Sequence, residues 1–241
     1  MDEFLNSAPD NEYLQHKLVA LLVIYGGLRK SEAVELLWED IQNEANKLKV
    51  TIKVSKTDQS EQGFIYFAIG NQNKKLCPVY YFQMYKPLVN NPAPNTRLIR
   101  QHHNTKDSYT LQPRGKDWFS KIGITIATFL KLKGPDTYTF HTFRRTATTW
   151  LAAQQVSIIT LKHFGRWKSS NVAEGYVAES DGTKMNIAEK IADQKQNKQS
   201  DIDPINEEEK IEKKIEKQNF SSAFVFNNCE ITFSDCKFFS D

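Results

Sequence analysis

The residues best suited to chemistry are a histidine, an arginine, a tryptophan and a tyrosine between positions 141 and 176. His141 and Arg144 are three residues apart, so both side chains share one face of a helix. Trp167 follows 23 residues after Arg144, and Tyr176 follows nine residues after Trp167. Cations can neutralise the non-bridging oxygens of a phosphodiester, an imidazole can move a proton, and a tyrosine oxygen can bond covalently to phosphorus. The set therefore suits attack on a phosphodiester.

A second guanidinium is expected beside the same phosphate. Charge that develops on two equatorial oxygens is best held by a pair of planar, permanently charged groups. The candidate is Arg29, which follows Gly26-Gly27-Leu28 and precedes Glu32. Taken alone, Arg29 is better explained as a surface arginine beside a helix start. Arg145 adjoins Arg144 but points about 100° away from it on a helix, so we expect it to bind a DNA phosphate or an internal carboxylate instead of sharing the face of His141.

In these motifs the chain resembles the tyrosine recombinases, the phage-integrase-like family. The first motif of that family reads G-L-R-x-x-E, the second reads H-x-x-R, and a G-H or G-W pair and a final tyrosine follow. A lysine on the β-hairpin of the family lies between the first two motifs. The matching residues here are Arg29 and Glu32, Lys56, His141 and Arg144, Trp167, and Tyr176. Lys56 by itself would be one more solvated lysine, but its 27-residue distance from Arg29 is normal for the family.

The resemblance implies a mechanism of strand cleavage and rejoining. Tyr176 would attack the phosphate and form a 3′-phosphotyrosyl bond, while Arg29 and Arg144 hold the oxygens of the phosphorane. Trp167 would donate its indole N–H, His141 and its surroundings would take up the proton of the phenol, and Lys56 would protonate the departing 5′ oxygen. Glu32 would brace the arginines. No metal, ATP or other cofactor is expected. Arg145, Arg166 and Lys168 are expected to contact double-stranded DNA.

Three segments narrow the resemblance to the Crypton-type recombinases of eukaryotic DNA transposons and their domesticated relatives. They are residues 55–59, 141–152 and 165–177. This implies a site-specific recombinase or integrase of a mobile element, acting in the nucleus; without a eukaryotic host the protein would be cytosolic. The alternative is a domesticated DNA-binding protein that no longer cleaves. Such a protein would be expected to lack one or more of the catalytic residues, and all are present. A type IB topoisomerase shares the chemistry but has a large cap region.

Charge and composition are compatible with a DNA partner. Residues 1–180 carry a formal charge of +7 and residues 181–241 carry −4, which together give the net charge of +3. A basic body suits contact with phosphates. The N-terminus has no signal-peptide pattern and there is no long apolar run, so we expect a soluble, intracellular protein without a membrane partner. Three cysteines without C-x-x-C spacing predict neither a disulfide framework nor a zinc site.

Periodicity predicts a mainly α fold with a small antiparallel sheet, the fold class of a tyrosine recombinase catalytic domain. Apolar residues at helical spacing predict helices over 11–25, 117–132, 141–153 and 156–164, with shorter ones over 32–38 and 76–88. Ser31 is the predicted cap of the helix over 32–38. Alternating residues predict a hairpin of strands 48–54 and 64–69, and a third short strand over 96–100.

The sequence divides into a catalytic domain over residues 1–180 and a tail over residues 181–241. We expect a polar helix over 185–198, a charged segment over 207–218, and then a short β-prone repeat in which residues 226–232 are echoed by 233–239. Chance similarity is an alternative explanation of that echo. The tail is expected to promote a homo-oligomer on DNA. The N-terminal domain with which relatives clamp DNA is expected to be absent, so the chain would be a fragment, or would depend on partners or on its tail.

Overall fold

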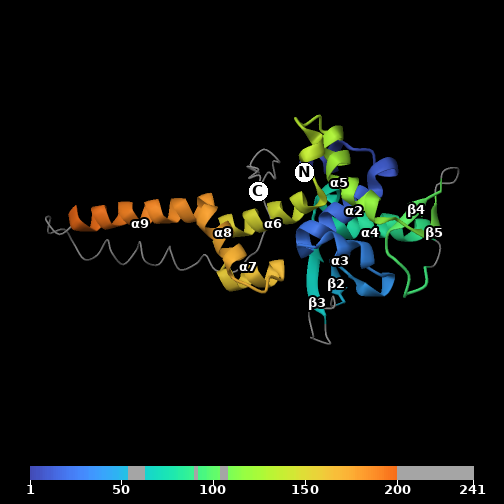
Figure 1. Cartoon of the computed structure of the whole chain (residues 1–241), viewed down its shortest axis with the longest axis horizontal. Coiled ribbons are helices and arrows are strands. Elements are labelled where there is room, and N and C mark those ends of the chain that lie inside the picture. Colours follow the sequence, from blue (N-terminus) through green and yellow to red (C-terminus); the bar gives the residue numbers. More distant parts are fainter. Residues whose placement is uncertain (54–62, 90–91, 104–107, 200–241) are drawn as a thin grey trace.

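The described chain is mostly helical and carries a small antiparallel sheet, as the sequence predicted. The computed structural model describes residues 1–53, 63–89, 92–103 and 108–199. A main body holds the sheet and the first helices, and a second group of helices extends from it (Figure 1). The predicted fold class, mainly α with a small sheet, is therefore confirmed.

Helix α2 (Asp10–Gly26) forms the centre of the main body. Its apolar residues lie all round the helix, and Leu14, Leu18 and Leu22 are each nearly inaccessible to solvent. A helix that is apolar on every side must be surrounded by other elements, and α2 packs against helices on several sides and against the sheet. Its C-cap is Gly27, which takes a left-handed conformation with φ of 53°. This places the segment that carries Arg29 at the C-terminal end of the central helix.

The three-stranded sheet has the order β1-β2-β3, with β1 at Ile41–Glu44, β2 at Lys47–Ile52 and β3 at Phe64–Ile69. The predicted β2–β3 hairpin is confirmed, and Val50 pairs with Tyr66 in its register. The strand predicted over 96–100 overlaps an observed strand only at Arg100, where β4 (Arg100–His102) begins, and Arg97 forms an isolated bridge to Leu37. The third strand of this sheet is β1, which was not predicted. β1 was missed because only its first residue is buried, so it lacks an alternating pattern.

The short helix that follows Arg29 also differs from its prediction. Helix α3 is Lys30–Glu35, and Arg29 occupies the N-cap position that was assigned to Ser31. The backbone N–H of Arg29 donates to the Glu32 carboxylate at 2.7 Å, which is the reciprocal half of a capping box. The helix stops before Leu36, which is extended and accepts a hydrogen bond from the backbone of Leu98 at 2.7 Å.

The remaining elements of the main body cover the sheet and α2. Tyr81 and Tyr85 are fully buried in the main core. A second, two-stranded sheet projects to the right in Figure 1. The elements are α1 (Asp2–Ser7), η1 (Trp38–Asp40), η2 (Lys74–Leu76), α4 (Pro78–Tyr85), η3 (Lys86–Val89), β4 (Arg100–His102), β5 (Tyr109–Pro113), α5 (Lys116–Phe129) and η4 (Pro135–Thr137).

A second group of helices begins with α6 (Phe140–Ala153), which starts in the main core and runs out of it (Figure 1). It is followed by α7 (Ile158–Gly165), α8 (Asn171–Glu179) and α9 (Asp181–Gln199). Phe140 and Phe143 belong to the main core, whereas Ala152 packs with Leu161 and Ala173 in a small separate cluster. Helix α6 therefore joins two hydrophobic clusters.

The predicted tail is described only in part. Helix α9 begins at Asp181, where the tail was expected to begin. It extends away from the body at the left of Figure 1. The charged segment and the short repeat fall within residues 200–241, which lie outside the described residues. Among the helices that are described, none combines the length and the apolar character needed to cross a membrane.

Gly26 provides a test of how tightly the sheet packs on α2. A Cβ atom at this position would lie 2.4 Å from the ring of Tyr66, whose hydroxyl donates to the Leu22 carbonyl at 3.1 Å. Because the ring is buried and held at both ends, Gly26→Ala should lower the free energy of unfolding by about 1–3 kcal/mol. Chemical denaturation would measure this.

The matched control is Gly115→Ala, where an added Cβ meets no atom within 4 Å. We expect that change to stay within about 0.5 kcal/mol of the parent. Equal stability of the two variants would contradict the packing of Tyr66 against α2.

Candidate active site

The site is centred on Glu32, whose side chain is only 9% exposed. Its carboxylate accepts from the Arg29 guanidinium at 2.8 Å and from the Arg166 guanidinium at 2.6 Å. Burial alone would raise the pKa of Glu32, but the hydrogen bonds and charge of Arg166, together with the bonds from Arg29, lower it below its usual value. Glu32 is therefore ionised at neutral pH and orders two arginines that come from opposite parts of the chain.

Arg29 lies at the edge of this site and is 43% exposed. Besides Glu32, its guanidinium donates to the backbone carbonyl of Arg166 at 2.7 Å and to that of Gly165 at 3.4 Å. The turn between α2 and α3 thus fixes the backbone position of Arg29. The carbonyls at the end of α7 fix the position of its guanidinium. Solvent can still reach the side chain, so a ligand can do so too.

Arg144 lies deeper than Arg29, and the whole residue is 2% exposed. Its guanidinium donates to the carbonyls of Gly27 and Gly165. Burial lowers the pKa of Arg144 to about 10, with further contributions from the positive charges of Arg29 and Arg166. Arg144 remains charged at neutral pH in an environment that disfavours its charge, so a bound anion would be stabilised there.

Trp167 and Tyr176 complete the site from the C-terminal group of helices. Their rings stack with centroids 5.7 Å apart and planes at 17°, and the guanidinium carbon of Arg144 lies 5.4 Å from the Trp167 ring. A Cβ at Gly165 would lie 2.4 Å from the indole, so only glycine lets Trp167 fold back over the end of α7. Tyr176 lies on helix α8, which follows Trp167 in the chain.

His141 lies on the first turn of α6 and shares its face with Arg145 as well as with Arg144. Together with Thr137, Thr139 and Thr142, His141 and Arg145 line a small hollow of about 120 Å³. The prediction that Arg145 would not share the face of His141 was wrong, because residues four apart on a helix are also neighbours. Burial, then the charges of Arg144 and Arg145, lower the pKa of His141 below its usual value. At neutral pH His141 is therefore a neutral imidazole.

The other predicted residues are placed differently. Lys56 falls within residues 54–62, outside the described residues, in the connection between β2 and β3. Lys168 is exposed, beyond Trp167. Arg166, predicted to contact DNA, directs its guanidinium inward to Glu32 and to backbone carbonyls. No sequence motif indicated the role of these carbonyls, although the Gly26-Gly27 pair marks a place where another group can approach the backbone closely.

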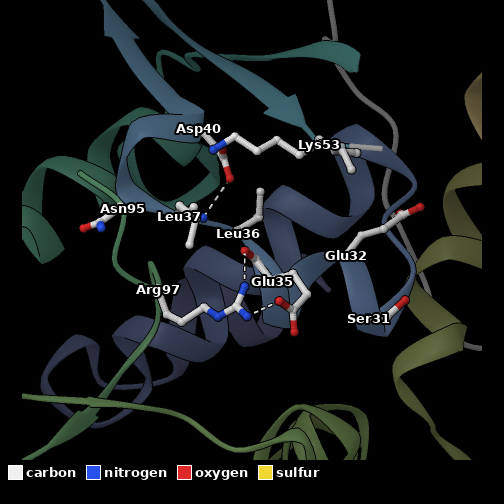
Figure 2. Close-up of a pocket in the computed structure, with 10 residues that line it drawn as sticks. Ser31, Glu32, Glu35, Leu36, Leu37, Asp40, Lys53, Asn95 and Arg97 are labelled. Carbon is white, nitrogen blue, oxygen red and sulfur yellow. Dashed lines mark hydrogen bonds and ion pairs between the residues drawn. The ribbon is translucent and has the colours of Figure 1, made fainter. Parts of the chain in front are cut away.

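A larger hollow of about 560 Å³ lies on the other side of α3, and Glu32 forms part of its wall. Two pairs of oppositely charged side chains line it, Arg97 with Glu35 and Lys53 with Asp40. Lys53 also pairs with Glu39, which lies outside the lining. Figure 2 shows the Arg97–Glu35 pair across the hollow from Lys53, while the Glu32 carboxylate points away from that pair. The hollow therefore presents compensated charge, unlike the arginine-rich site. Among the described residues no group of three or more histidine, cysteine, aspartate and glutamate side chains is arranged to hold a metal ion.

Comparisons with known proteins agree with this fold. A family model described as "Phage integrase family" matches residues 2–182. The structure of the XerH site-specific recombinase bound to palindromic difH substrate is similar, with a TM-score of 0.55 at 15% identity, over 76% of this chain and 47% of that one. The Tn1549 transposon integrase in complex with circular intermediate DNA gives 0.53 at 16%, over 79% and 63%. XerA recombinase gives 0.50 at 14%, over 77% and 58%.

The chain spans about half of the length of the XerH chains that it matches, and under two thirds of the others. At these identities the likeness concerns the fold. No curated protein matches the sequence significantly.

The environment of His141 predicts its titration. NMR of the imidazole should give a pKa below the ordinary value of 6.5. Because the folded-state value is lower than the unfolded one, protonation favours unfolding, and stability due to this group should fall as the pH drops below about 6.5. Arg145→Gln removes one positive neighbour and should raise the pKa of His141.

Lys184→Gln removes the same charge from exposed helix α9 and should leave that pKa unchanged. An equal shift in both variants would contradict a local effect of Arg145.

Proposed function

We propose that this chain, which belongs to the phage integrase family, breaks and rejoins DNA strands through a covalent bond between Tyr176 and a 3′ phosphate. The observation that carries the proposal is the convergence of Arg29 and Arg144 on the Gly165 carbonyl, with Trp167 and Tyr176 stacked beside Arg144. Residues from three separate segments meet there. The similar solved XerH recombinase is bound to difH substrate and the Tn1549 integrase is in complex with DNA, which supports DNA as the substrate.

Charge at the site favours a phosphodiester. Three guanidinium groups, those of Arg29, Arg144 and Arg166, gather around the single carboxylate of Glu32. The excess of positive charge lies where Gly165 presents a carbonyl oxygen to both Arg29 and Arg144. A phosphate oxygen is a stronger, charged acceptor for the same donors. Binding of DNA would therefore replace this internal contact with a phosphate and move the end of α7 or the guanidinium groups.

The chemical step would exchange one phosphoester for another. The Tyr176 oxygen attacks phosphorus as the bond from phosphorus to the 5′ oxygen breaks, while Arg29 and Arg144 stabilise the charge on the equatorial oxygens. A free phenol has a pKa near ~10, so its proton must leave during the attack. The neutral imidazole of His141 is a suitable acceptor for it. Lys56 would protonate the departing 5′ oxygen.

The new bond conserves the energy of the broken one, so a 5′ hydroxyl can reverse the reaction without ATP. We assign the protein to the site-specific recombinases or integrases of mobile elements, of the Crypton type, acting as a homo-oligomer on DNA in the nucleus. The sequence segments described above support this narrower assignment. The competing proposal is a domesticated relative that binds DNA without cleaving it, and the same experiment distinguishes the two.

The role of Tyr176 can be tested with a nicked substrate from which the 5′ hydroxyl fragment diffuses away after cleavage. The protein should remain bound to the DNA 3′ end through denaturing electrophoresis, and mass spectrometry should locate the bond at Tyr176. Tyr176→Phe should abolish the adduct yet bind DNA nearly as well as the parent, because the ring and its stacking on Trp167 are kept. Arg29→Ala should lower the rate roughly 100- to 1,000-fold through loss of oxyanion stabilisation.

The substrate should carry the terminal sequences of the parent element. Tyr138 is a control tyrosine away from the Trp167 stack, and it belongs to the segment before α6. Tyr138→Phe should still form the adduct. An adduct that persists in Tyr176→Phe would overturn the proposal, whereas tight binding without any adduct would favour the domesticated alternative.

Metal dependence offers a separate test. Two arginines and a lysine supply the positive charge that a magnesium ion supplies in metal-dependent nucleases. The adduct should therefore form at the same rate in excess EDTA as in magnesium chloride at equal ionic strength. Loss of the adduct in EDTA with recovery on adding magnesium would contradict the mechanism.

A further inference from the structure

We propose that Arg166 is a positioning residue for strand cleavage, which acts through Glu32 and the carbonyls at the end of α2 and does not bind DNA. This inference rests on the proposed function. Nothing in the motifs of the family calls for an arginine here, because the family has glycine directly before its histidine or tryptophan. In this chain Gly165 is followed by Arg166 before Trp167.

The backbone at Arg166 is in a conformation that favours glycine. Its φ is 49° and its ψ is 45°, at the C-cap of α7, and helices commonly end with a glycine in this left-handed region. A residue with a Cβ is strained there, and such strain persists where the surroundings hold the residue in place. Among the described residues only Lys131 and Gln155 are other non-glycine residues with positive φ, and both are exposed. The Arg166 side chain is only 10% exposed.

The contacts of its guanidinium explain why arginine stands at this position. Arginine has five N–H donors, and the structure gives Arg166 five acceptor contacts from them. Nε and one terminal nitrogen donate to the Glu32 carboxylate at 3.3 and 2.6 Å. The other contacts are to the carbonyls of Gly26 at 2.9 Å, Gly27 at 2.7 Å and Phe164 at 3.2 Å. No donor is left for a DNA phosphate.

Arg166 also closes a ring of interactions with Arg29. Arg29 donates to Glu32, Glu32 accepts from the Arg166 guanidinium, and the Arg166 carbonyl accepts from Arg29 at 2.7 Å. The guanidinium carbon lies 4.6 Å from the Phe64 ring on β3. One side chain at the end of α7 thereby fixes α3, the turn after α2 and the first residue of β3. Loss of this side chain would leave Glu32 with Arg29 alone and would release the turn that carries Arg29 from the segment that carries Trp167.

The test compares Arg166→Gly and Arg166→Lys with the parent on the nicked substrate. Arg166→Gly suits the backbone and removes every side-chain contact. We expect the rate of adduct formation at saturating DNA to fall about 100-fold, because a small misplacement of catalytic groups typically costs that much. The Kd for DNA should stay within about twofold of the parent value. Arg166→Lys keeps one charged contact to Glu32 and should restore part of the rate. Lys131→Gly makes the same backbone change at an exposed site and should leave rate and Kd unaltered.

Hydrogen exchange gives a second measurement that needs no cleavage. In Arg166→Gly, the backbone amides of residues 26–32 and 165–168 should exchange faster than in the parent, while those in the core of α2 are unchanged. Lys131→Gly should not alter exchange in these segments. Circular dichroism would verify that each variant is folded.

Unchanged exchange in both segments of Arg166→Gly would overturn the positioning role. A raised Kd with a normal rate at saturation would also overturn it, because that result indicates a DNA contact. If the parent protein forms no adduct, the proposed function fails, but the exchange measurement still decides whether Arg166 orders the site. Faster exchange together with a normal cleavage rate would confirm a structural contact and exclude the positioning role.

Discussion

The structure depends on one buried carboxylate that is shared by two arginines, Arg29 three residues away and Arg166 134 residues away in the sequence. Glu32 and Arg166 are 9% and 10% exposed at the point where they pair. Removing one member of a buried ion pair typically costs roughly 3–5 kcal/mol, because the partner is left charged and unpaired. The pair lies between the main core and the small cluster formed by α6, α7 and α8. The junction between these two apolar clusters is thus polar, and its hydrogen bonds fix the orientation of the charged side chains. A site that binds a charged ligand requires such fixed charges.

Backbone carbonyls supply most of the remaining contacts. The last residue of α2, the glycine after it and the last residue of α7 present oxygens to Arg144 and Arg166. Carbonyls at the C-terminal end of a helix have no partner within the helix and carry partial negative charge. Guanidinium groups are well suited to them. The same contacts cap two helices and aim the cations, so the stability of the site and the orientation of its charges have a common origin.

Excess positive charge remains after these contacts are made. The pKa of Arg144 is lowered by burial and by its cationic neighbours, and that of His141 is lowered by burial and by Arg144 and Arg145. Both pKa shifts indicate surroundings that disfavour a positive charge, and a bound anion would stabilise the charged side chains there. A phosphodiester would supply that anion, and its arrival would strengthen the hold of the arginines on the reacting group while it replaces the Gly165 carbonyl.

The sequence by itself determined the fold class, the β2–β3 hairpin and the existence of the main helices, because their apolar periodicities are set by residues close together in the chain. It also identified Arg29, Glu32, Arg144, Trp167 and Tyr176 as a set through motif and order. It could not give the short strand β1, whose single buried residue leaves no alternating pattern. Nor could local spacing tell that Arg145 would share the hollow beside His141.

The role of Arg166 was decided only by the tertiary structure. Beside Lys168 on a basic segment it was expected to contact DNA, and nothing local distinguishes the two side chains. Once α7 ends against the turn after α2, however, the carbonyls of Gly26 and Gly27 and the carboxylate of Glu32, more than 130 residues away, surround one guanidinium and leave the Lys168 side chain exposed. The direction of a long charged side chain is set by the positions of its hydrogen-bond acceptors in space. Only the packing of distant segments fixes those positions.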